Sequence, residues 1–307
     1  MRHSWGRYVR QHYPLYLFLL PGLVYLLLFK YAPLYGLLIA FKDFSLFSGN
    51  TIVTSIWNSP WVGWKHFEQL LNLPAFTDVL LNTVIISLYK IVFLFPLPIL
   101  FALLLNEIMV SWFKRFIQTV LYLPHFLSWV VVGGIFYSIL GTNGLVTQLF
   151  HDLFGSSPSF LMDAGLFRRV LVFQEGWKET GWNMIIYLAA ISAVDPHLYE
   201  AAKVDGAGRF QRMLYVTLPG IGSTIVLMLI MRLSRILEAG FEQILVMYNP
   251  TVYSVSDIIQ TYTYRVGLGQ MNFSLATAVG IFNSVTAFAL IVTANAACRK
   301  LFSRSIY

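Results

Sequence analysis

Long apolar runs constrain this chain more than any other feature of its sequence. Six of them lie at about 14–40, 78–106, 116–141, 168–194, 219–242 and 276–298. Each is close to or longer than the roughly 20 apolar residues that an α-helix needs to cross a bilayer. Only 11% of the residues are charged, whereas soluble domains carry roughly 25%, so too little charge is present to cover a water-facing surface. The sequence therefore predicts an all-α membrane protein with six transmembrane helices.

The first apolar run follows a short basic segment. Lys30 and Pro33 interrupt the run, which predicts a bend near its outer end. No small-residue cleavage site follows it cleanly, so we do not expect a signal peptide. The predicted organisation is a cytoplasmic N-terminal segment, 1–13, followed by one six-span domain over 14–307.

Lysine and arginine set the expected orientation. With the N-terminus inside, the inner segments hold eleven of the 21 basic residues, the outer loops hold five, and five lie within the runs. Because basic residues concentrate in cytoplasmic loops, both termini and the loop 195–219 are predicted to face the cytoplasm. The same placement explains the net charge of +7 without a nucleic-acid partner.

The loop 195–219, DPHLYEAAKVDGAGRFQRMLYVTLP, is the most polar internal segment of the chain. Asp195 and Pro196 are typical of a helix start, and Asp205 and Gly206 then interrupt the helix. The sequence predicts a helix, a bend and a second helix, with small residues that let another backbone approach closely. A simple amphipathic loop at the membrane surface is the alternative interpretation.

The residues of this loop resemble the EAA loop of permease subunits in bacterial binding-protein-dependent ABC importers. The matching positions are Glu200, Ala201, Ala202, Asp205, Gly206, Ala207, Leu218 and Pro219. Met213, where Phe is frequent, and 220–223, where a second proline often follows, depart from the pattern. The resemblance implies a type I ABC importer permease fold in which the loop docks into an ATPase subunit. The residues implied for this coupling are Glu200, Ala201, Ala202, Asp205, Gly206, Ala207 and Gly208.

The resemblance also implies a transport subunit and not an enzyme. The dipeptide Gly-Lys does not occur, so a GxxxxGK[ST] phosphate loop is absent from the sequence. ATP and Mg²⁺ would therefore be held by two separate ATPase subunits, and no cofactor is expected in this chain. No metal site is expected either, because the six histidines lack metal-ligand spacing. The other implied partners are a second homologous permease, an extracytoplasmic solute-binding protein and the lipid of a bacterial inner membrane.

The outer stretch 29–47, FKYAPLYGLLIAFKDFSLF, is similar to the carbohydrate branch of this family. Together with 58–71, NSPWVGWKHFEQLL, it is similar to the subgroup that handles complex oligo- and polysaccharides. The aromatic residues of the outer loops fit either a belt at the membrane interface or a docking surface for the binding protein.

Five basic residues lie within the predicted spans: Lys30, Lys90, Lys178, Arg232 and Arg235. A charge inside a membrane costs at least roughly 2.5–3.5 kcal/mol, so each should face a partner or a water-filled cavity. At about 1.5 Å per helical residue, Lys90, Lys178 and Arg235 lie about 24–26 Å from the cytoplasmic ends of their helices. Three cations from three spans are thus expected at one level.

The neighbours of these cations suit the lining of a path. The charged residues from 232 to 242 fall on one face of a helix at 100° per residue, and those from 175 to 179 share a face with Trp182. The candidate path residues are Lys90, Lys178, Trp182, Arg232, Arg235, Glu238 and Glu242. Pairing among the charges, such as Arg235 with Glu238 or Lys178 with Glu175, is the alternative.

Aromatic rings in such a path would stack on sugar rings, and its cations would attract anionic groups. The cargo hypothesis is therefore an oligo- or polysaccharide, with an acidic one built from uronic acids as the case that the cations favour. Within the resembling subgroup, the chain is most similar to an alginate importer, and this resemblance implies an alginate-like cargo. Three rival functions remain open. One is a six-span secondary sugar transporter driven by an ion gradient, with Glu238 or Glu242 carrying the proton. Another is an intramembrane hydrolase using His125 and Ser128, which lacks a GxSxG motif, and the third is a scaffold without solute flux.

Overall fold

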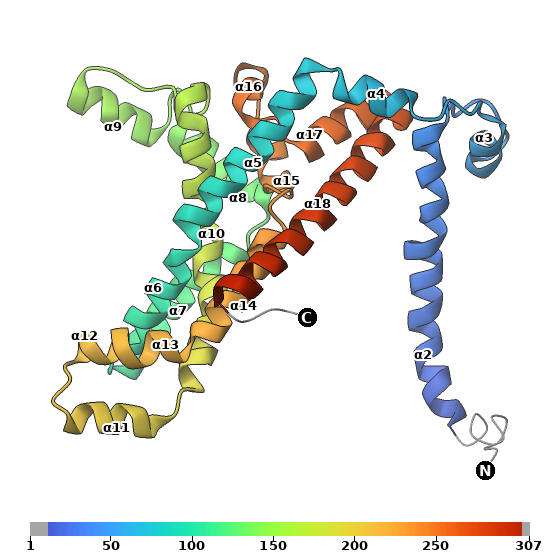
Figure 1. The fold of residues 1–307 in the computed structure, drawn as a ribbon. Coiled ribbons are helices and arrows are strands. Elements are labelled where there is room, and N and C mark those ends of the chain that lie inside the picture. Colours follow the sequence, from blue (N-terminus) through green and yellow to red (C-terminus); the bar gives the residue numbers. More distant parts are fainter. Residues whose placement is uncertain (1–11, 303–307) are drawn as a thin grey trace, which may run out of the picture. The chain divides into compact units, whose positions relative to one another are not determined.

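The computed structural model describes residues 12–302, and its regular secondary structure there is helical, apart from one isolated β-bridge between Lys42 and Trp61. The predicted all-α class is confirmed. The chain divides into two compact units, Met1–Asn72 with Val266–Ile281, and Leu73–Arg265 with Phe282–Tyr307 (Figure 1). Almost all of the predicted N-terminal segment, 1–13, lies outside the described residues.

The first unit contains one long helical stretch, Tyr13–Phe41. It comprises α2 (Tyr13–Leu26), the π-helix η1 (Leu27–Tyr31) and the 3₁₀ helix η2 (Ala32–Phe41). The helix type changes around Lys30 and Pro33, where the sequence predicts a bend, because proline lacks an amide donor and crowds the preceding turn. Two short helices follow, α3 (Ile52–Asn58) and α4 (Lys65–Leu71).

The second unit is built around two long helical columns. One is α5 (Pro74–Leu94) continued by α6 (Pro96–Asn106), and the other is α10 (Ala164–Ser192), which packs along it (Figure 1). Helix α7 (Ser111–Tyr122) also packs on α10. It comes so close that a Cβ at Gly181 would collide with the carbonyl oxygen of Leu121. Apolar side chains including Ala102, Met184 and Ile221 are buried among these helices.

The third predicted span, 116–141, is not one continuous helix. Helix α7 ends at Tyr122, a 3₁₀ turn η3 (Leu123–Phe126) follows, and α8 (Trp129–Leu140) starts anew. Pro124 in the turn has no amide hydrogen to donate, and the Ser128 hydroxyl accepts the Val131 N–H to cap α8. The prediction of a single spanning helix is wrong here. The sequence stays apolar across the break, so composition alone does not reveal it. Helix α9 (Leu145–Phe154) follows α8.

The fifth predicted span, 219–242, is wrong in its bounds. Helix α14 (Gly222–Ser234) stops well before residue 242, and it meets the helical stretch Arg209–Gly220 at 59°. A turn then leads to α15 (Phe241–Met247), with φ of 41° at Ala239 and 91° at Gly240. These two successive residues in the left-handed region separate the turn from α15, because a right-handed helix cannot continue through them.

Length and composition qualify four helical stretches of the described chain to cross a membrane. They are Tyr13–Phe41, Pro74–Asn106, Trp129–Phe154 and Phe273–Thr293, and the bent pair ending at Ser234 makes up to five. Helix α10 is long enough to cross a membrane, with 29 residues. It contains five charged residues between 168 and 179, so it is more polar than the qualifying helices. The protein is therefore a multi-span membrane protein, and the count of six and the side of the termini stay predictions.

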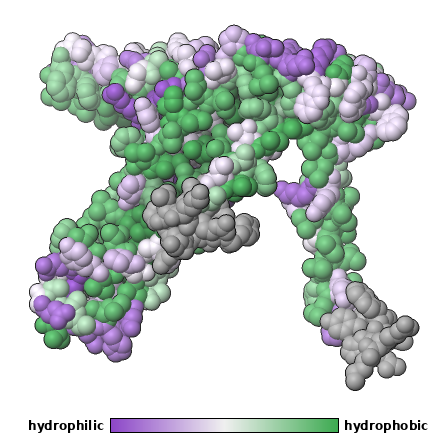
Figure 2. All heavy atoms as spheres, in the orientation of Figure 1, coloured by the Kyte–Doolittle hydropathy of each residue, from purple (hydrophilic) through white to green (hydrophobic). Residues whose placement is uncertain are grey.

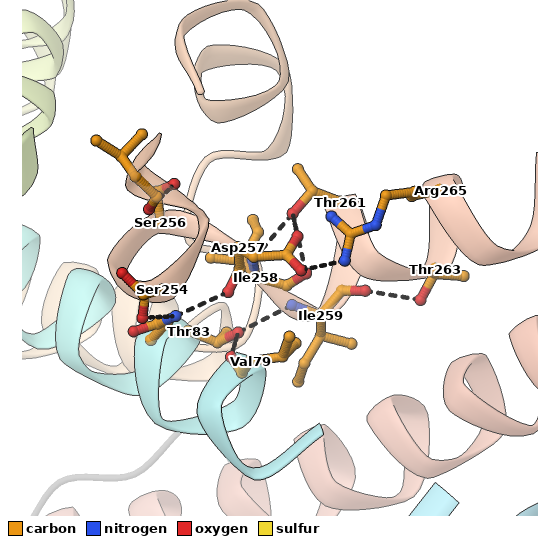
Figure 3. Close-up of polar contacts among 12 residues, drawn as sticks. Val79, Thr83, Ser254, Ser256, Asp257, Ile258, Ile259, Thr261, Thr263 and Arg265 are labelled. Atoms are coloured by element: carbon orange, nitrogen blue, oxygen red, sulfur yellow. Dashed lines mark hydrogen bonds and ion pairs between the residues drawn. The ribbon is translucent and has the colours of Figure 1, made fainter. Parts of the chain in front are cut away.

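The segment after α15 folds back onto α5 through buried polar contacts (Figure 3). It contains η5 (Pro250–Val252), α16 (Tyr253–Ser256) and α17 (Ile259–Tyr264), and η6 (Arg265–Gly269) then leads to α18 (Phe273–Phe302). The amide of Asn82 donates to the carbonyls of Ser254 and Asp257 at 3.1 and 3.2 Å, and the Thr83 hydroxyl accepts the Ile259 N–H at 3.0 Å. The Asp257 carboxylate in turn pairs with Arg265 at 2.6 Å.

Candidate functional site

A cavity of about 550 Å³ lies within the second unit, among α5, α10, α14 and the turn that leads into α15. Its charged lining residues are Lys90, Glu175, Arg232, Arg235, Glu238 and Glu242. Trp129, Phe241, Ser87 and Gln260 also line it. The cavity therefore combines charged, hydrogen-bonding and aromatic groups contributed by six helical elements and one turn.

Lys90 is the most deeply buried charged residue that lines this cavity, and we call its group of contacts the Lys90 network. Its ammonium group lies 2.5 Å from a carboxylate oxygen of Glu175 and donates to the Ala239 carbonyl and the Gln243 side chain, both at 2.7 Å. The other carboxylate oxygen of Glu175 accepts from Arg232 at 2.7 Å. Lys90 is only 1% exposed, so its ammonium group has lost its hydrating water. These contacts compensate for that loss.

Gln243 links Lys90 to the long helix α10. Its amide nitrogen donates to the Leu171 carbonyl and to the Gln174 side chain, both at 2.8 Å. Both glutamines are fully buried. The Lys90 network thus joins three elements that are far apart in sequence, and it fixes the turn before α15 against α5 and α10.

Other polar groups of the cavity have no partner within the described chain. Among residues 12–302, Arg235, Glu238 and Glu242 take part in no ion pair, and their side chains are exposed. The Ser87 hydroxyl and the Gln260 carbonyl oxygen are buried without a hydrogen-bond partner in that part of the chain. Buried polar atoms are nearly always paired, so these two are suited to meet a ligand or water.

A second charged cluster lies beside the cavity. The Lys178 ammonium group contacts Glu179 at 3.2 Å and donates to the His125 carbonyl at 2.6 Å. The His125 ring bonds to Glu179 at 2.8 Å and stacks on Trp182, with 4.3 Å between ring centroids and 3° between planes. Lys178 also lies 5.3 Å from the ring centroid of Trp129, which is the residue that connects this cluster to the cavity.

The structure brings most of the predicted path residues together around the cavity, but the secondary structure that places them differs from the prediction. Arg232, Arg235, Glu238 and Glu242 do not share a helix face. Helix α14 ends at Ser234, the turn after it carries Arg235 and Glu238, and α15 carries Glu242. The two ion pairs given as examples of the alternative are wrong. Lys178 pairs with Glu179 and not with Glu175, which pairs with Lys90 and Arg232. Arg235 and Glu238 form no ion pair among the described residues.

Several residues of the site escaped sequence reasoning. Ser87, Trp129, Gln174, Gln243 and Gln260 are uncharged, and single polar or aromatic residues in an apolar run are common. Gly240 was also missed, although a Cβ there would lie 2.5 Å from the Lys90 ammonium nitrogen. The available signal was its position beside Glu238 and Glu242, where glycine permits a turn within a charged segment.

The loop 195–219 forms the predicted helix, bend and helix. Helix α11 (Pro196–Val204) is capped by the Asp195 carboxylate, which accepts the His197 N–H at 2.9 Å. Gly206 has φ of 80°, and the Ala207 N–H then closes the turn onto the Ala202 carbonyl at 2.9 Å. The chain continues as α12 (Arg209–Arg212), η4 (Met213–Thr217) and α13 (Leu218–Gly220).

This loop lies at one end of the second unit and is poorly covered. None of the seven predicted coupling residues is buried, and the Glu200 side chain is 73% exposed. Val204 and Phe210 are 89% and 69% exposed. Figure 2 shows hydrophilic residues gathered at this end with hydrophobic ones among them. The Tyr199 hydroxyl donates to Thr217 at 3.0 Å, which holds α11 against η4 while its outer face stays free.

Comparison with known proteins identifies the family. The model of the binding-protein-dependent transport system inner membrane component matches residues 94–303. The chain belongs to this family. The polygalacturonan/rhamnogalacturonan transport system permease protein YteP of Bacillus subtilis (strain 168) is 45% identical over 300 residues, which are 97% of this chain and 91% of YteP. Protein LplB of the same strain is 44% identical over 305 residues, covering 99% of this chain and 94% of LplB.

A solved structure supports the fold. A chain in the crystal structure of a bacterial alginate ABC transporter in complex with an alginate pentasaccharide-bound periplasmic protein superposes with a TM-score of 0.89. It is 36% identical, and the match covers 99% of this chain and 100% of that one. The predicted class, a membrane permease of an ABC importer for carbohydrates, is confirmed. Two of the rival functions, the secondary transporter driven by an ion gradient and the intramembrane hydrolase, are therefore set aside, because proteins of this family are ABC importer permeases.

Proposed function

We propose that this chain forms half of the translocation path for an oligo- or polysaccharide that contains uronic acids. The observation that carries the proposal is the set of unpartnered polar groups around the 550 Å³ cavity. Ser87 and Gln260 offer neutral hydrogen-bonding atoms, Glu238 and Glu242 offer acceptors, and Arg235 offers a cation. A saccharide carries many hydroxyl groups, and such a lining can meet them at several points.

Aromatic residues complete the proposed path. Trp129 and Phe241 line the cavity, and the exposed Trp182 ring stacks on His125 beside it. Flat apolar rings next to hydrogen-bonding groups suit the faces of sugar rings. Lys90, Glu175 and Arg232 bond mainly to one another, so their role in this proposal is to hold the cavity open and to position its turn.

The acidic nature of the cargo is proposed on separate grounds. Three cations and three carboxylates line the cavity, so its own charges balance and give no net attraction for an anion. Support comes from Arg235, which is exposed to the cavity without a carboxylate partner among the described residues, and whose planar guanidinium suits a carboxylate. Polygalacturonan and alginate, which the similar proteins transport, are both built from uronic acids.

The remaining topology and partners form part of the same proposal. The chain would cross the bacterial inner membrane six times, with α10 as a charged span and both termini in the cytoplasm. It would pair with a second permease, receive cargo from a solute-binding protein and contact two ATPase subunits that hold ATP and Mg²⁺. Residues Glu200 to Gly208 would dock into an ATPase, and ATP-driven approach of the two ATPases would open the cavity outward.

Reconstitution tests this function. The chain would be purified with its co-expressed partners, placed in proteoliposomes with the binding protein and supplied with ATP inside. We expect oligogalacturonate or alginate oligosaccharides to stimulate ATP hydrolysis and to enter the vesicles, while a neutral maltooligosaccharide does neither. Stimulation by the neutral sugar alone would contradict the acidic cargo, and the absence of any saccharide flux would contradict the transport path.

A further inference from the structure

Three residues form a stripe along one side of α10. Arg169, Phe173 and Trp177 recur at intervals of four residues, which places them one above another on a helix. All three line two separate apolar cavities, of about 820 and 610 Å³. We call this stripe the α10 ridge, because each of its residues borders both cavities.

The two cavities lie between different helices. The larger is bounded by α5 and α6 through residues such as Tyr89 and Leu97, and it reaches Gly181 on α10. The smaller is bounded by α8 and by residues such as Val146 and Phe160. Both are within the size range of small-molecule sites. The ridge itself is open, since Phe173 is 67% and Trp177 41% exposed.

Arg169 is the cation at one end of this apolar surface. It is exposed, and among residues 12–302 its guanidinium takes part in no ion pair or hydrogen bond. Within the described chain, no Asp or Glu lines either cavity. A cation at a membrane-embedded surface requires a counter-ion or water, and the described part of the chain supplies no counter-ion there.

We propose that the α10 ridge binds one anionic phospholipid, with its phosphate on Arg169 and one acyl chain in each cavity. A single charge at the head of two apolar grooves matches a molecule with one anionic head and two apolar tails. The twelve helical steps from Arg169 to Gly181 span about 18 Å of helix, a little more than half of the roughly 30 Å hydrocarbon core. The planar guanidinium favours bidentate contact with a phosphate group.

The position of the ridge also selects a leaflet. Arg169 lies near the N-terminal end of α10, and α11 follows its C-terminal end. The lipid would therefore belong to the leaflet that faces away from the loop 195–219. A segment of the second permease that covered this surface instead is the rival occupant, and the test below distinguishes the two. The inference rests on the proposed topology, in which α10 spans the membrane, and does not depend on the cargo.

Lipid retention by the assembled transporter tests this site. The complex would be reconstituted in nanodiscs of phosphatidylethanolamine with a small fraction of dioleoyl phosphatidylglycerol, washed with detergent, and its bound phosphatidylglycerol counted by mass spectrometry. Arg169→Gln should retain roughly tenfold less, because one charge-assisted contact is lost, and Arg169→Lys should restore part of it. Arg115→Gln is the matched control, because Arg115 is an exposed cation on α7 that borders neither cavity.

Two further measurements separate the possible occupants. Leu97→Trp fills the larger cavity with all charges intact, and it should also lower the retention of phosphatidylglycerol. A benzoylphenylalanine photo-crosslinker at position 173 should form an adduct with lipid. Three outcomes would each overturn the proposal: equal retention by wild type and Arg169→Gln, no enrichment of phosphatidylglycerol over the zwitterionic phosphatidylethanolamine, or an adduct with the second permease.

Discussion

Lys90 and Gly240 fit together so closely that a Cβ on Gly240 would lie 2.5 Å from the Lys90 ammonium nitrogen. The same ammonium group bonds to the carbonyl of Ala239, the residue just before this glycine. The turn that follows α14 and places Arg235 and Glu238 at the cavity is thus tied to a buried cation on α5. Cavity shape and the Lys90 ion pair therefore depend on one another.

Gly240→Ala should destabilise the protein and displace Lys90. The residue has φ of 91°, a conformation that costs a non-glycine residue about 1–3 kcal/mol, and the new methyl group would collide with the ammonium group. The check is thermal unfolding of the purified complex together with saccharide uptake. Gly134→Ala is the control, because a Cβ at this α8 position meets nothing within 4 Å. A Gly240→Ala protein as stable as the control would show that the turn can relax.

Lys90→Met should destabilise the protein by about 3–5 kcal/mol, because Glu175 loses one of its two cationic partners while it stays buried. Adding Glu175→Gln should recover part of this loss, since the buried carboxylate is then removed. Unfolding of the two single variants and the double variant forms a double-mutant cycle. Additive losses would indicate that the pair contributes no coupling energy.

Arg235→Ala should act on cargo and not on folding. The side chain is exposed and unpaired within the described chain, so stability should change by no more than about 0.5 kcal/mol. We expect uptake of an oligogalacturonate to fall roughly tenfold through the lost charge-assisted contact. Uptake should be measured in proteoliposomes alongside the melting temperature. Unchanged uptake would remove Arg235 from the proposed path.

Glu200→Lys and Gly206→Pro should uncouple ATP hydrolysis from uptake while membrane insertion stays normal. Glu200 is the exposed carboxylate of α11, and the φ of 80° at Gly206 is inaccessible to proline, whose φ is fixed near −65°. ATPase activity and uptake would be measured on the same vesicles. Asp152→Lys is the matched charge reversal, at a side chain on α9 that is 76% exposed. Coupled transport in both variants would contradict the docking role of the loop.

Asn82→Leu should loosen the segment that carries α16 and α17. It removes two donated hydrogen bonds and the acceptor of Arg168, which donates to Asn82 at 2.6 Å, so we expect a loss of about 2 kcal/mol or more. Hydrogen exchange of the amides from 254 to 262 should accelerate. Ser138→Ala, which removes an exposed hydroxyl in α8, should leave that exchange unchanged. Equal protection in Asn82→Leu would mean that Thr83 holds the segment alone.

Local chemistry made part of this structure predictable. The proline and glycine of the loop 195–219 set its helix, bend and helix directly through backbone geometry, and the residues around them sufficed to indicate the family. The apolar runs gave the membrane class for a similar reason, because burial in lipid depends on the composition of each segment alone. The charged residues of the spans also predicted a polar site.

Partner choice within that site was decided by the tertiary structure. The sequence places Lys178 three residues from Glu175 on one face of α10, yet Glu175 pairs with Lys90 and Arg232 from two other helices. Helix packing and the turn at Ala239 and Gly240 bring these groups to within 3 Å, and no local spacing encodes that approach. An ion pair depends on distance in space, whereas sequence fixes distance only along a single helix; that is why the charges were foreseeable and their partners were not.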